Sequence, residues 1–440
     1  MPNIIGAAEK AARLAERPAV AVLRGERCLS VRDMDAPCAV CGEVCPHEAI
    51  EVLVGHEAPA EPHGSVVPRG PSGPRIDDER CTRCGRCVTA CPTGALLPLA
   101  PCDDETLLAA AARVGQAAAE AALSRAAGDP AGQTAAHAAD GEAPSVDSPE
   151  PGEVAGPADA GAPSPVAAAG FVCERAARAL RVDAERVAAL PCLAWLDEAL
   201  LVQAACSGAQ RVFALTAPCA SCDQAAAIAG LAEAAENAQA ILDVWRIPAT
   251  VELAGKGRAD AAKLVGLAAE PDEEASGEVS RRGMFSQARD ALRDAAENAA
   301  NAQIGKLAGT EAPAVPEPEP DVRRWRLLDN LHAAGLPQNS AAIVPRALAP
   351  RVSIDVEHCA GCGLCAAFCP TGALRKAGKG NGGRTIVEFD PPLCRDCGTC
   401  EGTCRYGALV RDESLTASEL FALDPHTTLI PKRRVLPTRR

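Results

Sequence analysis

A chain of 440 residues has room for about two to four domains, and this one contains 22 cysteines while Phe, Trp and Tyr make up only 2% of it. Its formal net charge of −14 argues against a nucleic-acid ligand, and no run of about 18 apolar residues offers a membrane span. Because residues 1–30 carry several charges, we expect no signal peptide and a cytoplasmic protein. In a reducing cytosol, so many thiols indicate metal ligands or redox groups rather than structural disulfides.

The chain begins with a predicted amphipathic helix at residues 7–17 and a strand at residues 19–23. Two cysteine runs follow, separated by a Pro- and Gly-rich surface loop. The second run has the spacing Cys-x2-Cys-x2-Cys-x3-Cys-Pro and consists of Cys81, Cys84, Cys87 and Cys91. The first run contains only the last three of these positions, as Cys38, Cys41 and Cys45. Asp35 stands where its leading cysteine is expected.

Paired runs with this spacing resemble bacterial-type ferredoxins that carry two [4Fe–4S] clusters, in which the fourth cysteine of each run ligates the cluster of the other run. The resemblance assigns one cluster to Cys28, Cys38, Cys41 and Cys91 and the other to Cys45, Cys81, Cys84 and Cys87. Cys28 is favoured over Asp35 because a thiolate is the softer and more usual cluster ligand. Residues 27–41 also resemble a group of ferredoxin-like electron-transfer subunits in which the first cysteine is displaced in this way.

An Ala-rich helix is predicted next, at residues 103–127, with acidic residues in its first turn as expected at a helix N-terminus. Residues 129–166 contain almost no large apolar side chain, so we expect a disordered linker there. A second break, rich in Pro and Glu, covers residues 311–321. Cys102 and Cys206 are interpreted as structural residues.

Between the two linkers, short apolar runs alternate with Ala-rich helical stretches, which predicts a small parallel α/β sheet. The predicted strands cover residues 166–172, 187–190, 211–215 and 241–244. The first three strands are followed by four cysteines: Cys173, Cys192, Cys219 and Cys222. Because the carboxyl ends of parallel strands face one crevice, we expect these thiols to converge. Four thiols at one rim suit a [2Fe–2S] cluster, with a [4Fe–4S] cluster or zinc as alternatives.

The middle region resembles the small iron–sulfur subunit of methyl-viologen-reducing hydrogenases, which carries a [2Fe–2S] cluster and links hydrogenase to heterodisulfide reductase. The resemblance rests on the segments FVCE at 171–174, LPC at 190–192 and RVFALTAPCASC at 211–222. It implies a cluster at the middle-domain cysteines and a hydrogenase-type redox partner. Two other interpretations remain open: Cys219 and Cys222 form a redox dithiol, or the cysteines are inert buried residues.

The C-terminal region contains two complete runs of the ferredoxin spacing. The same rule assigns one [4Fe–4S] cluster to Cys359, Cys362, Cys365 and Cys404 and the other to Cys369, Cys394, Cys397 and Cys400. Residues 352–356 and 385–389 are predicted strands, and the glycines between 378 and 383 indicate a hairpin turn. Structural zinc is the alternative, but a zinc site takes four ligands from two cysteine pairs and has no use for the remaining cysteines of each run.

The predicted fold is an α+β ferredoxin-like module at each end, a central small parallel α/β domain and disordered linkers. Its boundaries are 1–102 for the N-terminal module, 103–169 for a helix and linker, 170–270 for the α/β redox domain, 271–321 for a helix and linker, 322–411 for the C-terminal module and 412–440 for a tail. A helix at 322–334 is expected to pack on the C-terminal module. The basic tail contains Lys432, Arg433, Arg434, Arg439 and Arg440. It is expected to be solvated, and a small docking patch is the alternative.

Four [4Fe–4S] clusters and one further centre, by preference [2Fe–2S], predict an electron-transfer protein. No motif for an organic cofactor or a catalytic site is recognised, so we expect a component of an oxidoreductase complex rather than an independent enzyme. The expected partner is a separate redox protein, such as a hydrogenase, a formate dehydrogenase or a heterodisulfide-reductase-like enzyme. A cluster-fed thiol–disulfide reductase that uses Cys219 and Cys222 is the alternative, and a scaffold with structural clusters is a third interpretation.

Overall fold

A computed structural model describes residues 21–32, 38–53, 73–77, 79–98, 102–128, 167–180, 182, 184–254, 321–337, 339, 341–422 and 424–434. The chain divides into two compact units, and all of these residues belong to the same unit. The predicted helices at 7–17 and within 271–321, the two predicted linkers up to residue 320, and Asp35 lie outside the described residues. Within the ranges above, no helix has the length and apolar character needed to cross a membrane.

Four parallel strands form the sheet of the middle domain in the order β6-β5-β7-β8. They are β5 (Ala168–Cys173), β6 (Val187–Leu190), β7 (Arg211–Leu215) and β8 (Thr250–Ala254). The first three lie where the sequence predicts strands. The predicted strand at 241–244 is wrong, because these residues belong to the helix α8 (Leu231–Trp245). Buried residues recur along α8 at intervals of three and four, a helical pattern that a window of four residues conceals.

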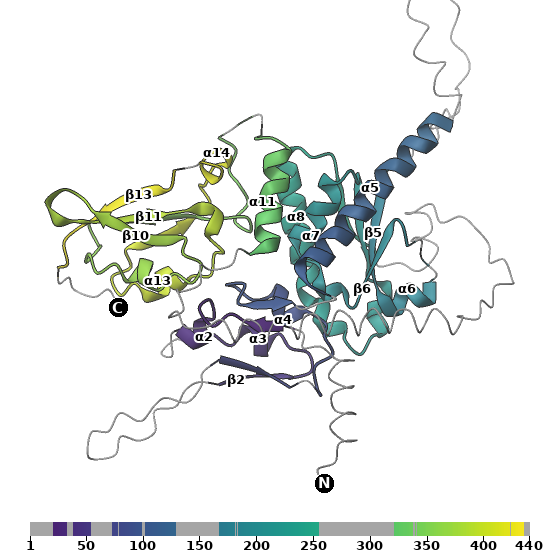
Figure 1. Ribbon diagram of the computed structural model, residues 1–440, viewed down its shortest axis with the longest axis horizontal. Coiled ribbons are helices and arrows are strands. Elements are labelled where there is room, and N and C mark those ends of the chain that lie inside the picture. Colours follow the sequence, from purple (N-terminus) through teal and green to yellow (C-terminus); the bar gives the residue numbers. More distant parts are fainter. Residues whose placement is uncertain are drawn as a thin grey trace, which may run out of the picture. The chain divides into compact units, whose positions relative to one another are not determined.

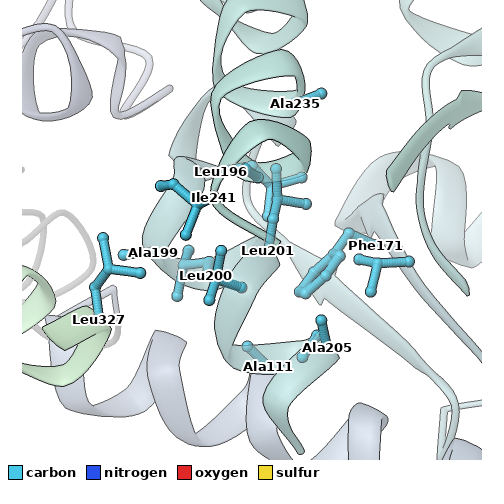
Figure 2. Close-up of a cluster of buried hydrophobic side chains, with 14 of the residues drawn as sticks. Ala111, Phe171, Leu196, Ala199, Leu200, Leu201, Ala205, Ala235, Ile241 and Leu327 are labelled. Carbon is cyan, nitrogen blue, oxygen red and sulfur yellow. The ribbon is translucent and has the colours of Figure 1, made fainter. Parts of the chain in front are cut away.

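Helix α7 (Glu198–Cys206) lies at the centre of the largest hydrophobic core. It begins at Asp197, whose carboxylate accepts a hydrogen bond from the Leu200 N–H at 3.1 Å. All seven residues from 199 to 205 are buried, as expected for a helix that is covered on every side. Side chains from β5, α8 and the later helix α11 (Val322–Ala333), among them Phe171, Ile241 and Leu327, pack in this core (Figure 2).

Helix α5 (Asp104–Gly128) packs closely on α7. Gly115 makes the approach possible, because a Cβ at this position would overlap the backbone carbonyl of Ala204. Ala111, Val114 and Ala118, at helical spacing, are fully buried. The helix predicted for residues 103–127 is therefore part of the middle-domain core, and the boundary expected between 102 and 170 does not separate it from that domain.

Helix α11 contacts the C-terminal module, as expected, because Arg324 donates a hydrogen bond to the Pro392 carbonyl at 3.2 Å, but its apolar face also packs on α7 of the middle domain. Leu327, Leu328 and Leu331 are buried in the core around α7. The indole nitrogen of Trp245 in α8 donates a hydrogen bond to the carbonyl of Leu331 at 3.1 Å. The sequence revealed the amphipathic face of α11 but not the surface that covers it.

The described part of the N-terminal module contains two antiparallel strand pairs (Figure 1). β1 (Ala21–Leu23) pairs with β4 (Leu96–Pro98), and β2 (Ile50–Leu53) pairs with β3 (Gly73–Ile76). Short helices lie beside the cysteine runs: α2 (Leu29–Arg32), α3 (Val40–Glu43) and α4 (Arg86–Thr89). The outer strands thus pair with each other, and so do the inner strands.

The C-terminal module repeats this topology. β9 (Arg351–Ile354) pairs with β12 (Leu409–Asp412), and β10 (Leu374–Lys379) pairs with β11 (Thr385–Phe389). The helices α12 (Leu364–Ala367) and α13 (Thr399–Thr403) take the places of α3 and α4. The Gly-rich stretch between β10 and β11 forms the predicted hairpin turn.

The predicted tail is wrong for residues 412–434. The strand β13 (His426–Ile430) extends the C-terminal sheet by pairing with β11, and α14 (Ala417–Leu420) is buried on one side. Thr416 and Glu419 form a capping box at the start of α14. This Thr-x-x-Glu signature in the sequence indicates a helix rather than a solvated tail. Residues 435–440 lie outside the described residues.

Candidate iron–sulfur sites

Four thiols of the N-terminal module line one small cavity: Cys28, Cys38, Cys41 and Cys91. Cys28 precedes α2, and Cys91 follows α4. Burial, reinforced by the charges of the other three thiols, raises the pKa of Cys41 to about 11. The structure therefore brings together the first predicted ligand set, with Cys28 in it.

A second cavity in the same module is lined by Cys45, Cys81, Cys84 and Cys87. Burial, followed by the charges of neighbouring thiols, raises the pKa of Cys87 to about 12. The last cysteine of the first run thus meets the first three of the second run, while Cys91 joins the first set. This exchange is the arrangement that cross-ligation of two [4Fe–4S] clusters requires.

The C-terminal module has the same exchange. A third cavity is lined by Cys369, Cys394, Cys397 and Cys400, and burial with the charges of the other three thiols raises the pKa of Cys400 to about 12. The fourth set is Cys359, Cys362, Cys365 and Cys404; burial and the charges of its other members raise the pKa of Cys365 to about 11. All four predicted sets are together in the structure, and iron ligation itself stays a prediction.

Among the described residues, no group of three or more His, Cys, Asp and Glu side chains forms a site for a single metal ion. One thiol in each set has a raised pKa: about 11 for Cys41 and Cys365, and about 12 for Cys87 and Cys400. These four thiols are protonated at neutral pH in the absence of metal, so cluster binding would release their protons.

A repeated turn aims a backbone N–H at the last cysteine sulfur of each run. The N–S distances are 3.2 Å for Ala49 to Cys45, 3.2 Å for Ala95 to Cys91, 3.4 Å for Leu374 to Cys369 and 3.3 Å for Ala408 to Cys404. The third residue after each cysteine has a positive φ: Glu48, Gly94, Gly372 and Gly407. An N–H donor stabilises negative charge on sulfur, so each of these four sulfurs is suited to act as a thiolate ligand.

The middle-domain thiols gather at the carboxyl ends of β5, β6 and β7. Cys173 ends β5, Cys192 follows β6, and Cys219 stands in a short 3-10 helix after β7. Burial raises the pKa of Cys219 to about 11, with further contributions from Cys173 and Cys222. The predicted convergence of these four thiols therefore agrees with their placement.

The two cysteines interpreted as structural stand apart from these sets. Cys206 is the last residue of α7, and burial alone raises its pKa to about 11. Cys102 is buried just before α5, where burial and the carboxylates of Glu174 and Asp103 raise its pKa. No neighbouring thiol contributes to either shift.

Two segments of the chain match families of iron–sulfur proteins. Residues 74–97 match the 4Fe-4S binding domain, and residues 358–408 match the 4Fe-4S dicluster domain. The chain therefore contains ferredoxin-type 4Fe-4S domains in two places. The matches include the run from Cys81 to Cys91 and every cysteine from Cys359 to Cys404, but not the first run or the middle domain. Comparison with curated proteins and with solved structures gave no match.

The 4Fe-4S domain at residues 74–97 contacts the middle domain through Trp195. The indole nitrogen of Trp195 donates a hydrogen bond to the Arg83 carbonyl at 3.1 Å, and the Thr89 hydroxyl donates one to the Ala194 carbonyl at 3.2 Å. Gly85, with a φ of +82°, lies against the indole, and a Cβ there would overlap the ring. The loop that carries the cluster cysteines therefore rests directly on the middle domain.

This contact brings two thiol sets next to each other. Burial raises the pKa of Cys192 to about 11. The charges of three thiols add to this rise, and the contribution of Cys84 is larger than those of Cys219 and Cys173. Cys84 belongs to the second set of the N-terminal module. The middle-domain thiols are therefore neighbours of that set.

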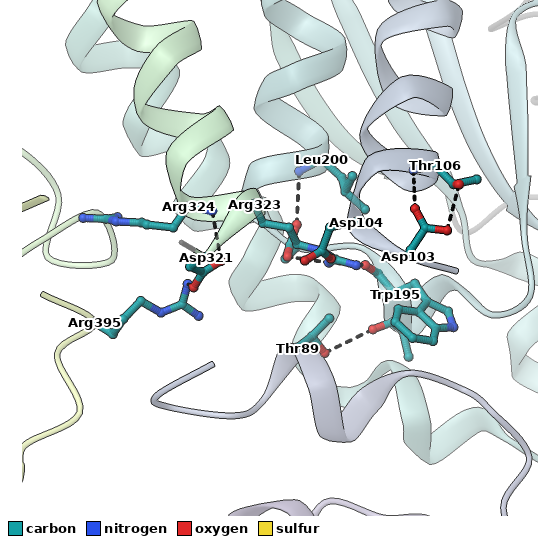
Figure 3. A network of polar contacts seen from close by, with 12 residues as sticks. Thr89, Asp103, Asp104, Thr106, Trp195, Leu200, Asp321, Arg323, Arg324 and Arg395 are labelled. Atoms are coloured by element: carbon teal, nitrogen blue, oxygen red, sulfur yellow. Dashed lines mark hydrogen bonds and ion pairs between the residues drawn. The ribbon is translucent and has the colours of Figure 1, made fainter. Parts of the chain in front are cut away.

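A second contact joins the two iron–sulfur modules at Asp321, the N-cap of α11 (Figure 3). Its carboxylate pairs with Arg395 at 2.6 Å and accepts a hydrogen bond from the Arg324 N–H at 3.2 Å. Burial raises the pKa of Asp321, but Arg395, the Arg324 N–H and Arg27 outweigh burial and hold the pKa below its usual value. A buried carboxylate with these partners is ionised at neutral pH.

The arginines at Asp321 stand beside cluster cysteines. Arg27 directly precedes Cys28, and Arg395 directly follows Cys394. Cys91 of the first set and Cys394 of the third set line the same cavity of about 200 Å³. The first set of the N-terminal module and the third set, in the C-terminal module, therefore each contribute one cysteine to the lining of the same cavity.

Arg323 forms a buried ionic centre next to this junction (Figure 3). Its guanidinium pairs with Asp104 of α5 at 2.5 Å and with Asp197, the cap of α7, at 2.6 Å. It also donates to the Trp195 carbonyl at 3.1 Å. No sequence motif predicts the roles of Arg323 and Asp321; the only local signal is the position of Asp321 before a helix.

Proposed function

We propose that the chain is an iron–sulfur electron-transfer protein with four [4Fe–4S] clusters, one in each of the four-cysteine sets of its two modules. The observation that carries this proposal is the grouping of sixteen cysteines into four cross-exchanged sets. The backbone N–H at the last cysteine of each run adds support. A bound cluster would supply one-electron redox chemistry, and the chain supplies its ligands, its charge environment and its distance to the next site.

We further propose a fifth centre, a [2Fe–2S] cluster, at Cys173, Cys192, Cys219 and Cys222. Their position at the carboxyl ends of three parallel strands supports a ligand site there. The likeness of residues 171–222 to the small iron–sulfur subunit of methyl-viologen-reducing hydrogenases supports the cluster type. This centre would exchange electrons with a separate cytoplasmic oxidoreductase, for which a hydrogenase, a formate dehydrogenase and a heterodisulfide-reductase-like enzyme are the candidates.

The contacts between the sets support one order for the relay. The middle-domain thiols adjoin the set of Cys84, which shares its module with the set of Cys91. Cys91 and Cys394 line the same cavity, together with Asp321. The set of Cys359 is then the far end. In this order, each site lies next to another site of the relay. The middle-domain thiols and the set of Cys359 form its two ends, which are available to partner proteins.

The thiol–disulfide reductase gains no support from the placement of its two cysteines. A reactive thiol needs a lowered pKa, which a helix N-terminus or a nearby cation would provide. Burial instead raises the pKa of Cys219 to about 11. The thiol of Cys222 donates to the carboxylate of Asp223 at 3.5 Å and accepts a hydrogen bond from the Gln224 N–H at 3.4 Å. These surroundings suit ligands whose protons a metal displaces.

Iron and sulfide analysis of the anaerobically purified full chain tests the proposal. Four [4Fe–4S] clusters require about 16 irons, and the fifth centre adds about 2. The variant Cys192→Ser should lose only these 2 irons and the corresponding EPR signal after dithionite reduction. The matched control Cys206→Ser, at a half-buried thiol of the same domain, should lose none. An iron content of about 8 or less would overturn the four-cluster assignment, and unchanged iron in Cys192→Ser would overturn the fifth centre.

A further inference from the structure

Exposed basic side chains gather beside the loop of Cys359, in a chain whose net charge is −14. Residues 374–384, which form β10 and the hairpin turn, contain four basic residues and no acidic residue. Residues 431–434 contain three basic residues and no acidic residue. All seven side chains belong to exposed residues: Arg375, Lys376, Lys379, Arg384, Lys432, Arg433 and Arg434. Arg375 pairs with Glu388 at 2.8 Å and with Asp390 at 3.5 Å, so the local excess of positive charge comes from the other six side chains.

Three of these residues contact the Cys359 loop itself, and we call Lys376, Lys432 and Arg434 the basic collar. The Arg434 guanidinium donates hydrogen bonds to the carbonyls of Val356 at 2.9 Å, Glu357 at 2.7 Å and Cys359 at 3.1 Å. Its backbone N–H donates to the Ala360 carbonyl at 2.9 Å. The end of the chain that the sequence predicts as a solvated tail therefore encloses the loop.

Two glycines of the loop let the lysines come close. The side chain of Lys376 lies over Gly363, and the backbone of Lys432 lies against Gly361, so that a Cβ at either glycine would overlap its neighbour. The described residues contain no ion pair of Lys376 or Lys432. The Lys376 ammonium therefore lies beside the Cys359 loop, and the Lys432 ammonium lies beside Gly383 of the neighbouring hairpin turn.

Exposed apolar groups lie within the same face. Leu364, between Cys362 and Cys365, is 39% exposed, and Val356, at the Arg434 guanidinium, is 42% exposed. An apolar centre with a charged rim is the usual composition of a transient protein interface. Charge on the rim steers the encounter and fixes its orientation more than it adds affinity.

We propose that the basic collar docks an acidic redox protein, so that electrons enter or leave the chain at the set of Cys359, Cys362, Cys365 and Cys404. The inference rests on the proposed function and adds the partner's charge and its place of docking. A protein is favoured over a polyanion such as a membrane or nucleic acid, because a small positive face on a chain of net charge −14 fits a partner of limited contact area. Its position over a cluster loop also serves electron exchange.

Stopped-flow oxidation of the dithionite-reduced full chain tests the docking. One probe is an acidic flavodoxin, whose oxidised flavin takes one electron from the chain and one proton from water to become the neutral semiquinone. The other is cytochrome c, a basic protein whose haem iron takes one electron. We expect the flavodoxin rate to fall as ionic strength rises. We expect the variant Lys376→Glu/Lys432→Glu to lower that rate more than tenfold at low salt without slowing cytochrome c.

Arg175→Glu/Arg178→Glu is the matched control. It makes the same charge change on the exposed helix α6 (Glu174–Leu180) of the middle domain. If only this control slowed flavodoxin, docking would lie at the middle-domain thiols and the proposal would be wrong. A salt-independent rate, equal in all variants, would also overturn it, while normal iron content and EPR spectra would leave the proposed function standing.

Two further measurements do not depend on electron transfer. Carbodiimide cross-linking of the oxidised chain to flavodoxin should join Lys376 or Lys432 to flavodoxin carboxylates, as identified by mass spectrometry. Cross-links confined to other lysines would contradict the collar. Binding of the chain to phosphatidylserine vesicles or to duplex DNA that is lost in the charge-reversed variant would assign the face to a polyanion instead.

Discussion

Replacement of Arg323 by methionine tests how the middle domain holds its neighbours. The Arg323, Asp104 and Asp197 side chains are only 7%, 12% and 17% exposed, and both ion pairs are short. Methionine fills much of the same space but leaves two buried carboxylates without their counter-charge. Breaking a buried ion pair by removing one partner costs about 3–5 kcal/mol. We therefore expect Arg323→Met to lower the free energy of unfolding by about that amount.

Urea unfolding followed by tryptophan fluorescence measures this loss, because the fully buried Trp195 lies directly beside Arg323. The matched control is Arg178→Met, which removes an arginine that is 82% exposed from a pair with Glu174. Exposed pairs of this kind contribute about 0.5 kcal/mol or less. The triple variant Arg323→Met/Asp104→Asn/Asp197→Asn should regain most of the loss, since it removes the unpaired charges as well.

The pH dependence gives an independent check. Burial raises the pKa of Asp104 in the native state, and Arg323 opposes this rise. Without Arg323 the native pKa of Asp104 rises further above its unfolded value, so protonation favours the folded state. The deficit of Arg323→Met should therefore be fully present at alkaline pH and should shrink as pH falls through the native pKa of Asp104. A loss below about 1 kcal/mol, or a triple variant no more stable than the single one, would refute the reasoning.

Three further predictions concern the cluster loops. Gly85→Ala adds left-handed strain and a clash with the indole and should cost about 2–4 kcal/mol in urea unfolding, whereas Gly372→Ala, at a φ of +73° with open space around it, should cost about 1 kcal/mol. Asp321→Asn should weaken the spin–spin coupling in the EPR spectrum of the reduced chain at unchanged iron content; an unchanged spectrum would remove Asp321 from the junction between modules. Cys28→Ala should lose about 4 irons and Asp35→Ala none; the reverse result would make Asp35 the ligand.

The sequence predicted the cysteine sets because their chemistry is written locally. A cluster loop needs cysteines at fixed short intervals, and the turn that follows needs a residue that tolerates positive φ, so the pattern repeats in the chain. The bounds of β6, β7 and β11 also agree with the predicted strands, because alternating or short apolar runs flanked by polar residues carry enough information. Cys28 was found through the regular spacing of the other runs.

Non-local packing could not be predicted in the same way. The residues at 241–244 form a short apolar run that fits a strand or a buried helix equally well, and only the longer period of α8 decides between them. β8, which completes the sheet, carries Glu252 in its centre and escaped notice for that reason. Arg323 and Asp104 are 219 positions apart, and no feature of either segment specifies the other.

These long-range contacts hold the modules against the middle domain and each other, whereas the sequence predicts separate modules joined by linkers. Asp321 and Arg323 stand two residues apart at the start of α11, yet they bind different neighbours. Asp321 pairs with Arg395 of the C-terminal module, and Arg323 pairs with the middle-domain residues Asp104 and Asp197. The N-terminal end of α11 thus binds the C-terminal module and the middle domain at the same time. Electron transfer between sites requires short and constant distances. Buried ion pairs at the N-terminal end of α11 would fix these distances in the proposed relay, whereas freely moving modules would not.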